Sequence, residues 1–154
     1  MTQKQALKPV LVQHIYLEAS PERVYQHLTQ AHLLERWFPH KVSTDPRVGG
    51  QLSYEFLHGE KRHHIEGRYL ELVPEQKVVY SWHESLDQAR IQTNLTVTFR
   101  LEAKGSGTEL YLEESGYRDD AAHLEHQGKR IQGWEFFFTN LKLLLEEGKD
   151  HRSH

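Results

Sequence analysis

The stretch from Ala121 to Glu147 reads AAHLEHQGKRIQGWEFFFTNLKLLLEE, and it decides how the rest of the chain must fold. Its apolar residues recur at alternating steps of three and four, which predicts one apolar stripe along a helix. The stripe comprises Ile131, Trp134, Phe138, Leu141 and Leu145, and Phe137 and Leu144 widen it. Gly148 follows the last apolar turn and is typical of a helix end. Because an amphipathic helix of this kind is not stable alone in water, we expect its apolar side to lie against another part of the chain.

The residues before this helix predict one strand, two short helices and then six further strands. We expect the first strand at residues 10–17, a helix that begins at Ser20-Pro21-Glu22, and a second helical segment at residues 31–37. Alternating apolar residues predict the later strands, at or around residues 42–45, 51–57, 62–73, 78–82, 95–99 and 110–112.

Short turns join these strands, which indicates an antiparallel meander. The predicted fold class is therefore α+β: a curved antiparallel sheet of about six or seven strands wrapped around the long C-terminal helix, with two short helices after the first strand. We expect the fourth of these strands to bend near Gly67, which leaves open whether Tyr69 or Leu70 faces the helix.

Length and composition favour a single intracellular domain. We expect a flexible leader at residues 1–9, one domain at residues 10–148 and a polar tail at residues 149–154 of the 154-residue chain. The absence of cysteine excludes disulfides and thiolate catalysis, and no apolar run is long enough to cross a membrane. The polar N-terminal residues lack a signal-peptide core, so we expect a cytoplasmic location. A net charge of −3 argues against a nucleic-acid partner.

Several short motifs occur in a characteristic order between residues 10 and 147. They are Ser20–Tyr25 (SPERVY), Leu34–Pro39 (LERWFP), Gly49-Gly50, Gly67, Leu72–Trp82 (LVPEQKVVYSW), Gly107–Leu110 (GTEL), Ser115–Tyr117 (SGY) and Gly133-Trp134. With these motifs the chain resembles the SRPBCC or START-like superfamily, the helix-grip fold that is also found in Bet v 1-like proteins. Within it, the chain is most similar to the family named for the activator of the heat-shock protein 90 ATPase. Members of the superfamily include ligand carriers, aromatase- or cyclase-like proteins and co-chaperone domains.

The resemblance implies a ligand cavity between the sheet and the long helix. The side chains that we expect on its walls combine apolar bodies with the polar tips of tyrosine and tryptophan, which suits an aromatic or lipid-like ligand that carries a few oxygens. The predicted cavity residues are Trp37, Phe38, Tyr54, Phe56, His63, Ile65, Tyr80, Trp82, Val97, Phe99, Leu112, Glu114, Trp134 and Phe138.

The same aromatic pattern is also typical of an ordinary packed core. An empty apolar cavity of about 300 Å³ would cost roughly 7 kcal/mol, which is comparable to the net stability of a whole domain, about 5–15 kcal/mol. We therefore expect any cavity here to be wet, occupied or partly collapsed.

Two charged residues have two interpretations each. Glu114 stands where the family often has histidine or an apolar residue, and it shares a strand face with Leu110 and Leu112. Either the strand end frays into solvent at this point, or Glu114 is a polar anchor inside the cavity. Arg130, on the long helix, is long enough to reach a ligand carboxylate or phosphate, although a solvated arginine is the simpler interpretation.

The sequence carries no recognisable catalytic or cofactor motif. It has no Gly-x-Ser-x-Gly elbow and no phosphate-binding loop, and we predict no cofactor. His123 and His126 are three residues apart near the start of the long helix, close to Asp119 and Asp120. They are weak candidates for a surface metal site, and we predict no bound metal.

We predict a small-molecule binding protein that holds a hydrophobic or aromatic ligand, such as a lipid-, flavonoid- or polyketide-like compound. No residue is assigned a catalytic role. One alternative is a co-chaperone-like domain that contacts a chaperone or another protein, which the resemblance alone supports. A second alternative is a cyclase-, aromatase- or hydrolase-like enzyme that uses polar groups of the same cavity, such as His63, Tyr80 or Glu114.

Overall fold

The computed structural model describes residues 7–38, 41–58, 61–85, 92–118 and 121–150, with side chains for residues 11–38, 41–55, 64–83, 94–116 and 127–150. Within these ranges the chain forms seven strands and three helices in the predicted order. They are β1 (Leu7–Leu17), α1 (Pro21–Thr29), α2 (Ala31–Leu34), β2 (Lys41–Thr44), β3 (Gln51–His58), β4 (Lys61–Val73), β5 (Lys77–Ser85), β6 (Gln92–Lys104), β7 (Gly107–Arg118) and α3 (Ala121–Glu147).

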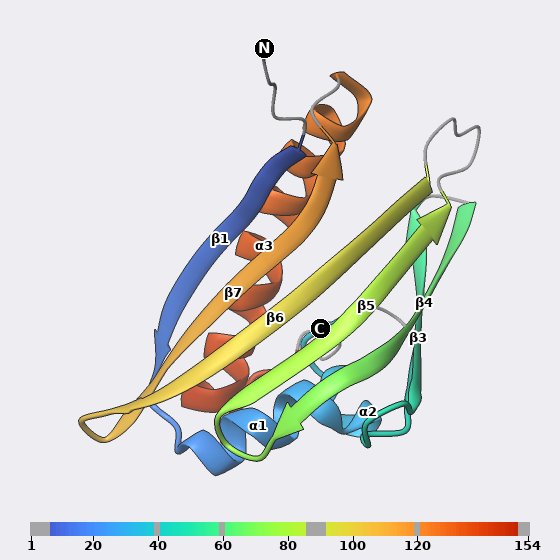
Figure 1. Ribbon diagram of the computed structural model, residues 1–154. Helices are drawn as coiled ribbons and strands as arrows, with labels where there is room; N and C mark the ends of the chain where they lie inside the picture. Colours follow the sequence, from blue (N-terminus) through green and yellow to red (C-terminus); the bar gives the residue numbers. More distant parts are fainter. Residues whose placement is uncertain (1–6, 39–40, 59–60, 86–91, 119–120, 151–154) are drawn as a thin grey trace.

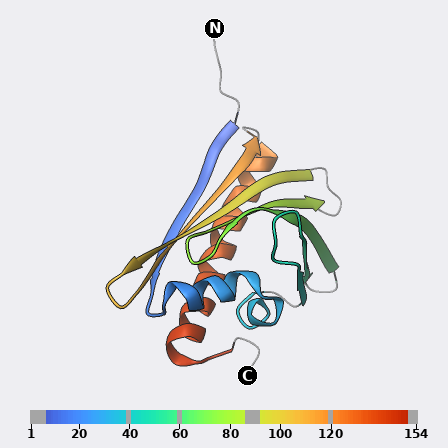
Figure 2. The same cartoon turned by 60° about the horizontal axis from the view of Figure 1, so that its bottom comes forward.

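The seven strands form one antiparallel sheet with the order β1-β7-β6-β5-β4-β3-β2. Strands β2 to β7 form a meander, whereas β1 pairs with β7 at the far edge. The long helix α3 lies along one face of the curved sheet, and α1 and α2 lie at one end of it (Figures 1 and 2). This arrangement confirms the predicted α+β helix-grip fold.

The first helix begins where the sequence predicts. The Ser20 side chain accepts a hydrogen bond from the backbone N–H of Arg23 at 3.2 Å, and proline occupies the first helical turn. Several boundaries differ from the prediction, and β6 and β7 in particular extend beyond the predicted residues 95–99 and 110–112. Strand β1 begins at Leu7, three residues early, because its pairing with β7 extends to Arg118. Helix α2 ends at Leu34 and continues as a turn, in which Phe38 N–H donates to the Leu34 carbonyl at 2.7 Å.

The apolar stripe of α3 is buried as predicted, except at its first residue. Its members from Trp134 to Leu145 lie in the core, and Phe137 packs against them partly buried, but Ile131 is 38% exposed. Each residue advances a helix by about 100°, so Ile131 lies about 60° from Trp134 on one side and Arg130 about 40° on the other. The inward position one turn before Trp134 therefore belongs to Arg130.

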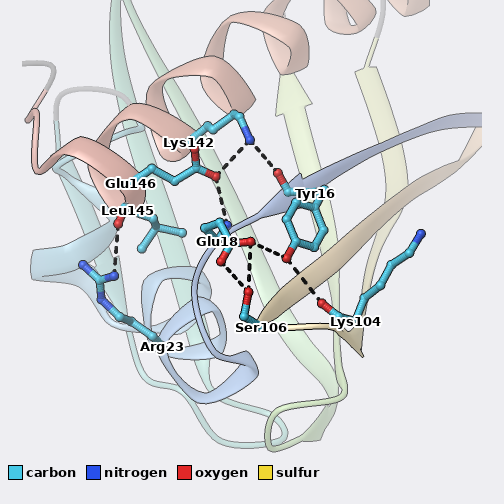
Figure 3. Close-up of polar contacts among 8 residues, drawn as sticks. All are labelled: Tyr16, Glu18, Arg23, Lys104, Ser106, Lys142, Leu145 and Glu146. Atoms are coloured by element: carbon cyan, nitrogen blue, oxygen red, sulfur yellow. Dashed lines mark hydrogen bonds and ion pairs between the residues drawn. The ribbon is translucent and has the colours of Figure 1, made fainter.

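Polar contacts hold the C-terminal end of α3 in place. Gly148 has a φ of +70° and its N–H donates to the Leu144 carbonyl at 2.9 Å, which confirms the predicted helix end. Figure 3 shows how the last turns of α3 meet the end of β1: Glu146 accepts from the Glu18 N–H and from Lys142, both at 2.9 Å. The Glu18 side chain in turn accepts from Ser106 of the β6–β7 turn. No helix among the described residues is long and apolar enough to span a membrane.

Strand β4 approaches β5 so closely that only glycine fits at position 67. A Cβ atom there would lie 1.8 Å from the carbonyl oxygen of Ser81. Just beyond it the β4–β5 register shifts between Tyr69 and Glu71. Tyr69 is buried and Leu70 is 51% exposed, so Tyr69 is the residue that faces the interior.

Candidate functional site

The structure buries all of the predicted cavity residues whose side chains it describes. These are Trp37, Phe38, Tyr54, Ile65, Tyr80, Trp82, Val97, Phe99, Leu112, Glu114, Trp134 and Phe138. The remaining two, Phe56 and His63, pair with each other in the β3–β4 ladder, and their side chains lie outside the described part of the chain. The described residues of this set therefore lie in one core cluster. That they hold a ligand stays a prediction.

The metal candidates His123 and His126 lie on α3, but their side chains are also outside the described residues. Among the residues that the structure does describe, no group of three or more histidine, cysteine, aspartate or glutamate side chains is arranged to hold a metal ion. The metal site therefore stays an untested hypothesis.

Phe38 joins the three sides of the interior. Its ring centroid lies 5.1 Å from those of Trp37 and Tyr54, 5.3 Å from that of Trp134, and 4.4 Å from that of Phe137, on which it stacks. The ring thus connects the end of α2, the sheet and α3. Aromatic contacts at these distances stabilise the fold beyond the area that they bury.

The aromatic contacts continue across the sheet. The Tyr54 and Trp82 rings lie 5.2 Å apart, and the Tyr80 ring lies 6.1 Å from Trp82 and 6.3 Å from Phe99. Phe99 meets Trp134 of α3 edge-on at 5.6 Å, which closes the cluster against the helix. We call this set of contacting rings, together with Phe38, the aromatic interior.

A carboxylate lies inside the aromatic interior. Glu114 has no exposed surface, and its Oε1 accepts a hydrogen bond from Arg130 Nε at 2.8 Å. Its Oε2 accepts from Arg130 Nη2 and also from Trp134 Nε1 at 2.8 Å. The geometry is a bidentate ion pair with a third donor, which satisfies most of the carboxylate's capacity to accept hydrogen bonds.

Two of the sequence-based interpretations are therefore wrong. Strand β7 does not fray at Glu114, because this residue pairs with Leu11 of β1 on one side and Val97 of β6 on the other. Arg130 is not a solvated arginine either, since only 11% of its side chain is exposed. The sequence placed Glu114 on the inward strand face, but nothing in it indicated that Arg130 would be the partner.

The Arg130 guanidinium also contacts two aromatic rings. It lies 4.5 Å from the ring centroid of Trp82 and 5.9 Å from that of Trp134. A cation over the face of tryptophan is stabilised by the ring quadrupole, most strongly where water is excluded. The site therefore holds one negative charge, on Glu114, and one positive charge, on Arg130, next to aromatic rings.

Tyrosine hydroxyl groups supply further polar atoms to the aromatic interior. The Tyr54 and Tyr80 hydroxyls are hydrogen-bonded to each other, and burial raises the pKa of both groups. The nearby Glu114 carboxylate raises the pKa of Tyr80 further, because a second negative charge would be repelled. Both tyrosines are therefore neutral at physiological pH and are suited to hydrogen bonding instead of proton transfer.

Fold and site together define a helix-grip domain, a long helix held by a curved sheet around an aromatic interior with a few buried polar groups. The family model described as "Activator of Hsp90 ATPase homolog 1-like protein" matches residues 18–146, and the chain belongs to this family, within the SRPBCC or Bet v 1-like superfamily. A comparison with curated protein sequences found no match.

Solved structures share this fold over nearly the whole chain. A protein from Chromobacterium violaceum is 28% identical with a TM-score of 0.77, and the match covers 90% of this chain and 97% of that one. The Aha1 dimer from Colwellia psychrerythraea is 23% identical with a TM-score of 0.72, over 91% and 98%. DynU16, a protein in the dynemicin biosynthetic locus, is 17% identical with a TM-score of 0.76, over 93% and 49%. The last two likenesses establish the fold alone.

Proposed function

We propose that this protein binds a hydrophobic or aromatic small molecule between the sheet and α3. The observation that carries the proposal is the Glu114–Arg130 ion pair inside the aromatic interior. Removing two charges from water costs several kcal/mol for each ion, and well-packed apolar side chains in their place are often as stable or more stable. A contribution to stability therefore does not by itself explain why the ion pair is buried, whereas a role in binding the polar atoms of a ligand does explain it.

The side chains around the ion pair indicate what kind of ligand fits. Trp82, Trp134 and Phe38 offer the faces and edges of flat rings, and Tyr80 and Arg130 bring polar atoms among them. Sites for small molecules typically combine a mostly apolar lining with a few such polar groups. A lipid-, flavonoid- or polyketide-like compound with a few oxygen atoms matches this chemistry.

Ligand entry would have to rearrange the rings, because they contact one another in this structure. The Phe38 ring contacts rings of both β3 and α3, and it follows α2 instead of lying within the sheet or α3. We infer that the Phe38 ring moves when a ligand binds, and that the ligand then makes the contacts with Tyr54 and α3 that the ring makes in this structure.

Tryptophan fluorescence offers a direct test, because all three tryptophans of the chain are buried in this region. We would titrate the protein with a mixed library of lipids, flavonoid-like aromatics and polyketide-like compounds, and measure thermal unfolding in parallel. A bound ligand should change the emission and raise the melting temperature, since it stabilises only the folded state.

Two variants of α3 sharpen this test. Arg130→Lys removes the bidentate geometry and should weaken binding. Phe136→Ala changes a ring on the same helix that is 61% exposed, and should leave binding unchanged. Unchanged emission and melting temperature across the library, at concentrations near solubility, would contradict the proposal.

The same experiment separates the two alternative functions. A silent library together with co-purification of a chaperone would favour the protein-interaction domain that the family name suggests. Turnover of a bound compound that is lost in Glu114→Gln would favour an enzyme. Both alternatives, and the cytoplasmic location, stay predictions.

A further inference from the structure

Tyr69 of β4 ends in a buried hydroxyl group that has no hydrogen-bond partner among the described residues. The residue is 1% exposed, and its hydroxyl makes no hydrogen bond to any of the residues that the structure describes. Buried polar side-chain atoms in folded proteins nearly always have a partner, because an unpaired one has lost its hydrogen bonds to water without replacement. We therefore expect the Tyr69 hydroxyl to have a hydrogen-bond partner that does not belong to the described residues.

The backbone holds Tyr69 in this position. Its N–H donates to the Gly50 carbonyl at 3.0 Å, and its own carbonyl accepts from the Gly49 N–H at 2.8 Å. The ring also meets Tyr80 edge-on, with centroids 6.1 Å apart. Because both the main chain and the ring are fixed, the hydroxyl cannot turn away to reach water.

The Thr44 hydroxyl, which lies near Tyr69, does not serve as its partner. The Thr44 hydroxyl already donates to the Thr29 carbonyl at 2.8 Å. It lies close enough to Tyr69 to lower the tyrosine pKa slightly, but without the geometry of a hydrogen bond. Burial raises the Tyr69 pKa, so the hydroxyl is neutral and can act as a hydrogen-bond donor.

Strand register connects Tyr69 to the ion pair. Tyr69 pairs with Tyr80, Tyr80 with Val97, and Val97 with Glu114, so the four residues form one row across β4, β5, β6 and β7. All four are buried. Three strand spacings of about 4.8 Å separate the ends of the row, which places Tyr69 and Glu114 about 14 Å apart along the sheet.

We propose that the Tyr69 hydroxyl donates a hydrogen bond to an uncharged oxygen of the ligand, a ketone, quinone or ether, at the end of the site opposite the Glu114–Arg130 pair. This inference rests on the proposed function and adds to it a ligand chemistry. The row in the sheet favours an elongated, oxygenated ring skeleton that lies across the strands. A carboxylate or phosphate at the Tyr69 end is disfavoured, because Tyr69 is buried and an unpaired charge is costly to remove from water.

The test compares 1-tetralone with tetralin, two ring compounds that differ by one carbonyl oxygen. Calorimetric titration gives the ratio of their dissociation constants for the wild type and for Tyr69→Phe, which keeps the ring and removes only the hydroxyl. We expect the preference for 1-tetralone to fall by about two- to tenfold in the variant, the range that one hydrogen bond supplies. Phe136→Ala is the binding control.

Thermal unfolding without ligand supplies an independent readout. Tyr69→Phe should melt at a higher temperature than the wild type, because it removes an unpaired buried hydroxyl. Tyr54→Phe, the same change at a hydroxyl that is bonded to Tyr80, should melt at a lower temperature. A lower melting temperature for Tyr69→Phe would show that a buried water or another group already satisfies the hydroxyl, and would overturn the proposal.

The remaining outcomes are also decisive. If the wild type and Tyr69→Phe bind both compounds with an unchanged preference, the Tyr69 contact is refuted while the proposed function stands. If the wild type binds neither compound nor any member of the wider library, the proposed function fails and the Tyr69 contact fails with it.

Discussion

Glu114→Gln and Arg130→Met, made singly and together, test whether the ion pair behaves as one unit. Removing one partner of a buried ion pair costs about 3–5 kcal/mol, because the remaining charge loses its counter-charge away from water. Glutamine keeps the size of glutamate and an oxygen that can accept from Trp134, whose Nε1 lies 2.8 Å from the carboxylate. Methionine keeps an unbranched apolar chain in place of Arg130 and can fill the gap beside the rings.

The two single variants should differ, because the charges that remain differ in exposure. The Arg130 side chain is 11% exposed, whereas that of Glu114 has no exposed surface. The arginine left by Glu114→Gln can move toward water, so we expect a loss near the lower limit, about 3 kcal/mol. The carboxylate left by Arg130→Met has no such route, and we expect a loss near about 5 kcal/mol.

The double variant has no buried charge and should be more stable than either single variant. The double variant should therefore lose less than about 3 kcal/mol instead of the additive value of about 8 kcal/mol, a departure from additivity of more than about 5 kcal/mol. Urea unfolding followed by tryptophan fluorescence and circular dichroism gives the free energy of unfolding of all four proteins. Effects that add within about 0.5 kcal/mol would refute the reasoning, because uncoupled sites behave in that way.

The neighbouring pair Arg100–Glu113 is a matched control. It joins the same two types of side chain across β6 and β7 at 2.9 Å, but with side-chain exposures of 57% and 39%. Glu113→Gln should cost less than about 1 kcal/mol, since water screens an exposed pair. The contrast between adjacent glutamates on one strand isolates the effect of burial.

Three further predictions concern the interior, the sheet and pH. Phe38→Ala should lower the free energy of unfolding by about 3–5 kcal/mol and speed ligand association in stopped-flow fluorescence, since it removes the ring that fills the site; slower association would contradict its assigned place. Gly67→Ala should lower the free energy of unfolding in urea by about 1–3 kcal/mol, because the added Cβ meets a carbonyl oxygen of β5. Gly133→Ala in α3 adds a Cβ that meets nothing within 4 Å and should raise the free energy of unfolding by about 0.5–1 kcal/mol. Equal effects of the two variants would argue against the close approach of β4 to β5. The Tyr16 hydroxyl and the Ser106 hydroxyl hold the pKa of Glu18 below its ordinary value of about 4.5 (Figure 3). The stability that these contacts give the folded state is therefore present above pH 4.5 and is lost as the pH falls through the folded-state pKa of Glu18. The midpoint of the Glu18 carboxyl titration, followed by the NMR chemical shift of its side-chain carboxyl carbon, should lie below that ordinary value, and Ser106→Ala should move it to higher pH; an unchanged midpoint in the variant would count against the contact.

Much of the fold could be predicted because it depends on local patterns. The spacing of Trp134, Phe138 and Leu141 identifies the buried side of α3, and alternation identifies the inward side chains of the strands, such as Tyr80 and Trp82. Periodicity of side chains is a property of each element by itself, so it is visible before the elements come together. The candidate site residues were found in the same way, as inward positions.

What those inward side chains contact is decided only by the tertiary structure. Glu114 and Arg130 are 16 residues apart, and their pairing depends on how far α3 is rotated over the sheet, which also turns Ile131 outward. The bulge in β4 that faces Tyr69 inward and Leu70 outward is likewise set by the fit of β4 to β5. The sequence by itself determined the order of elements and the composition of the interior. The rotation of α3 and the register of β4 decided which polar atoms meet and which is left unpaired, because both arise from packing between segments distant along the chain.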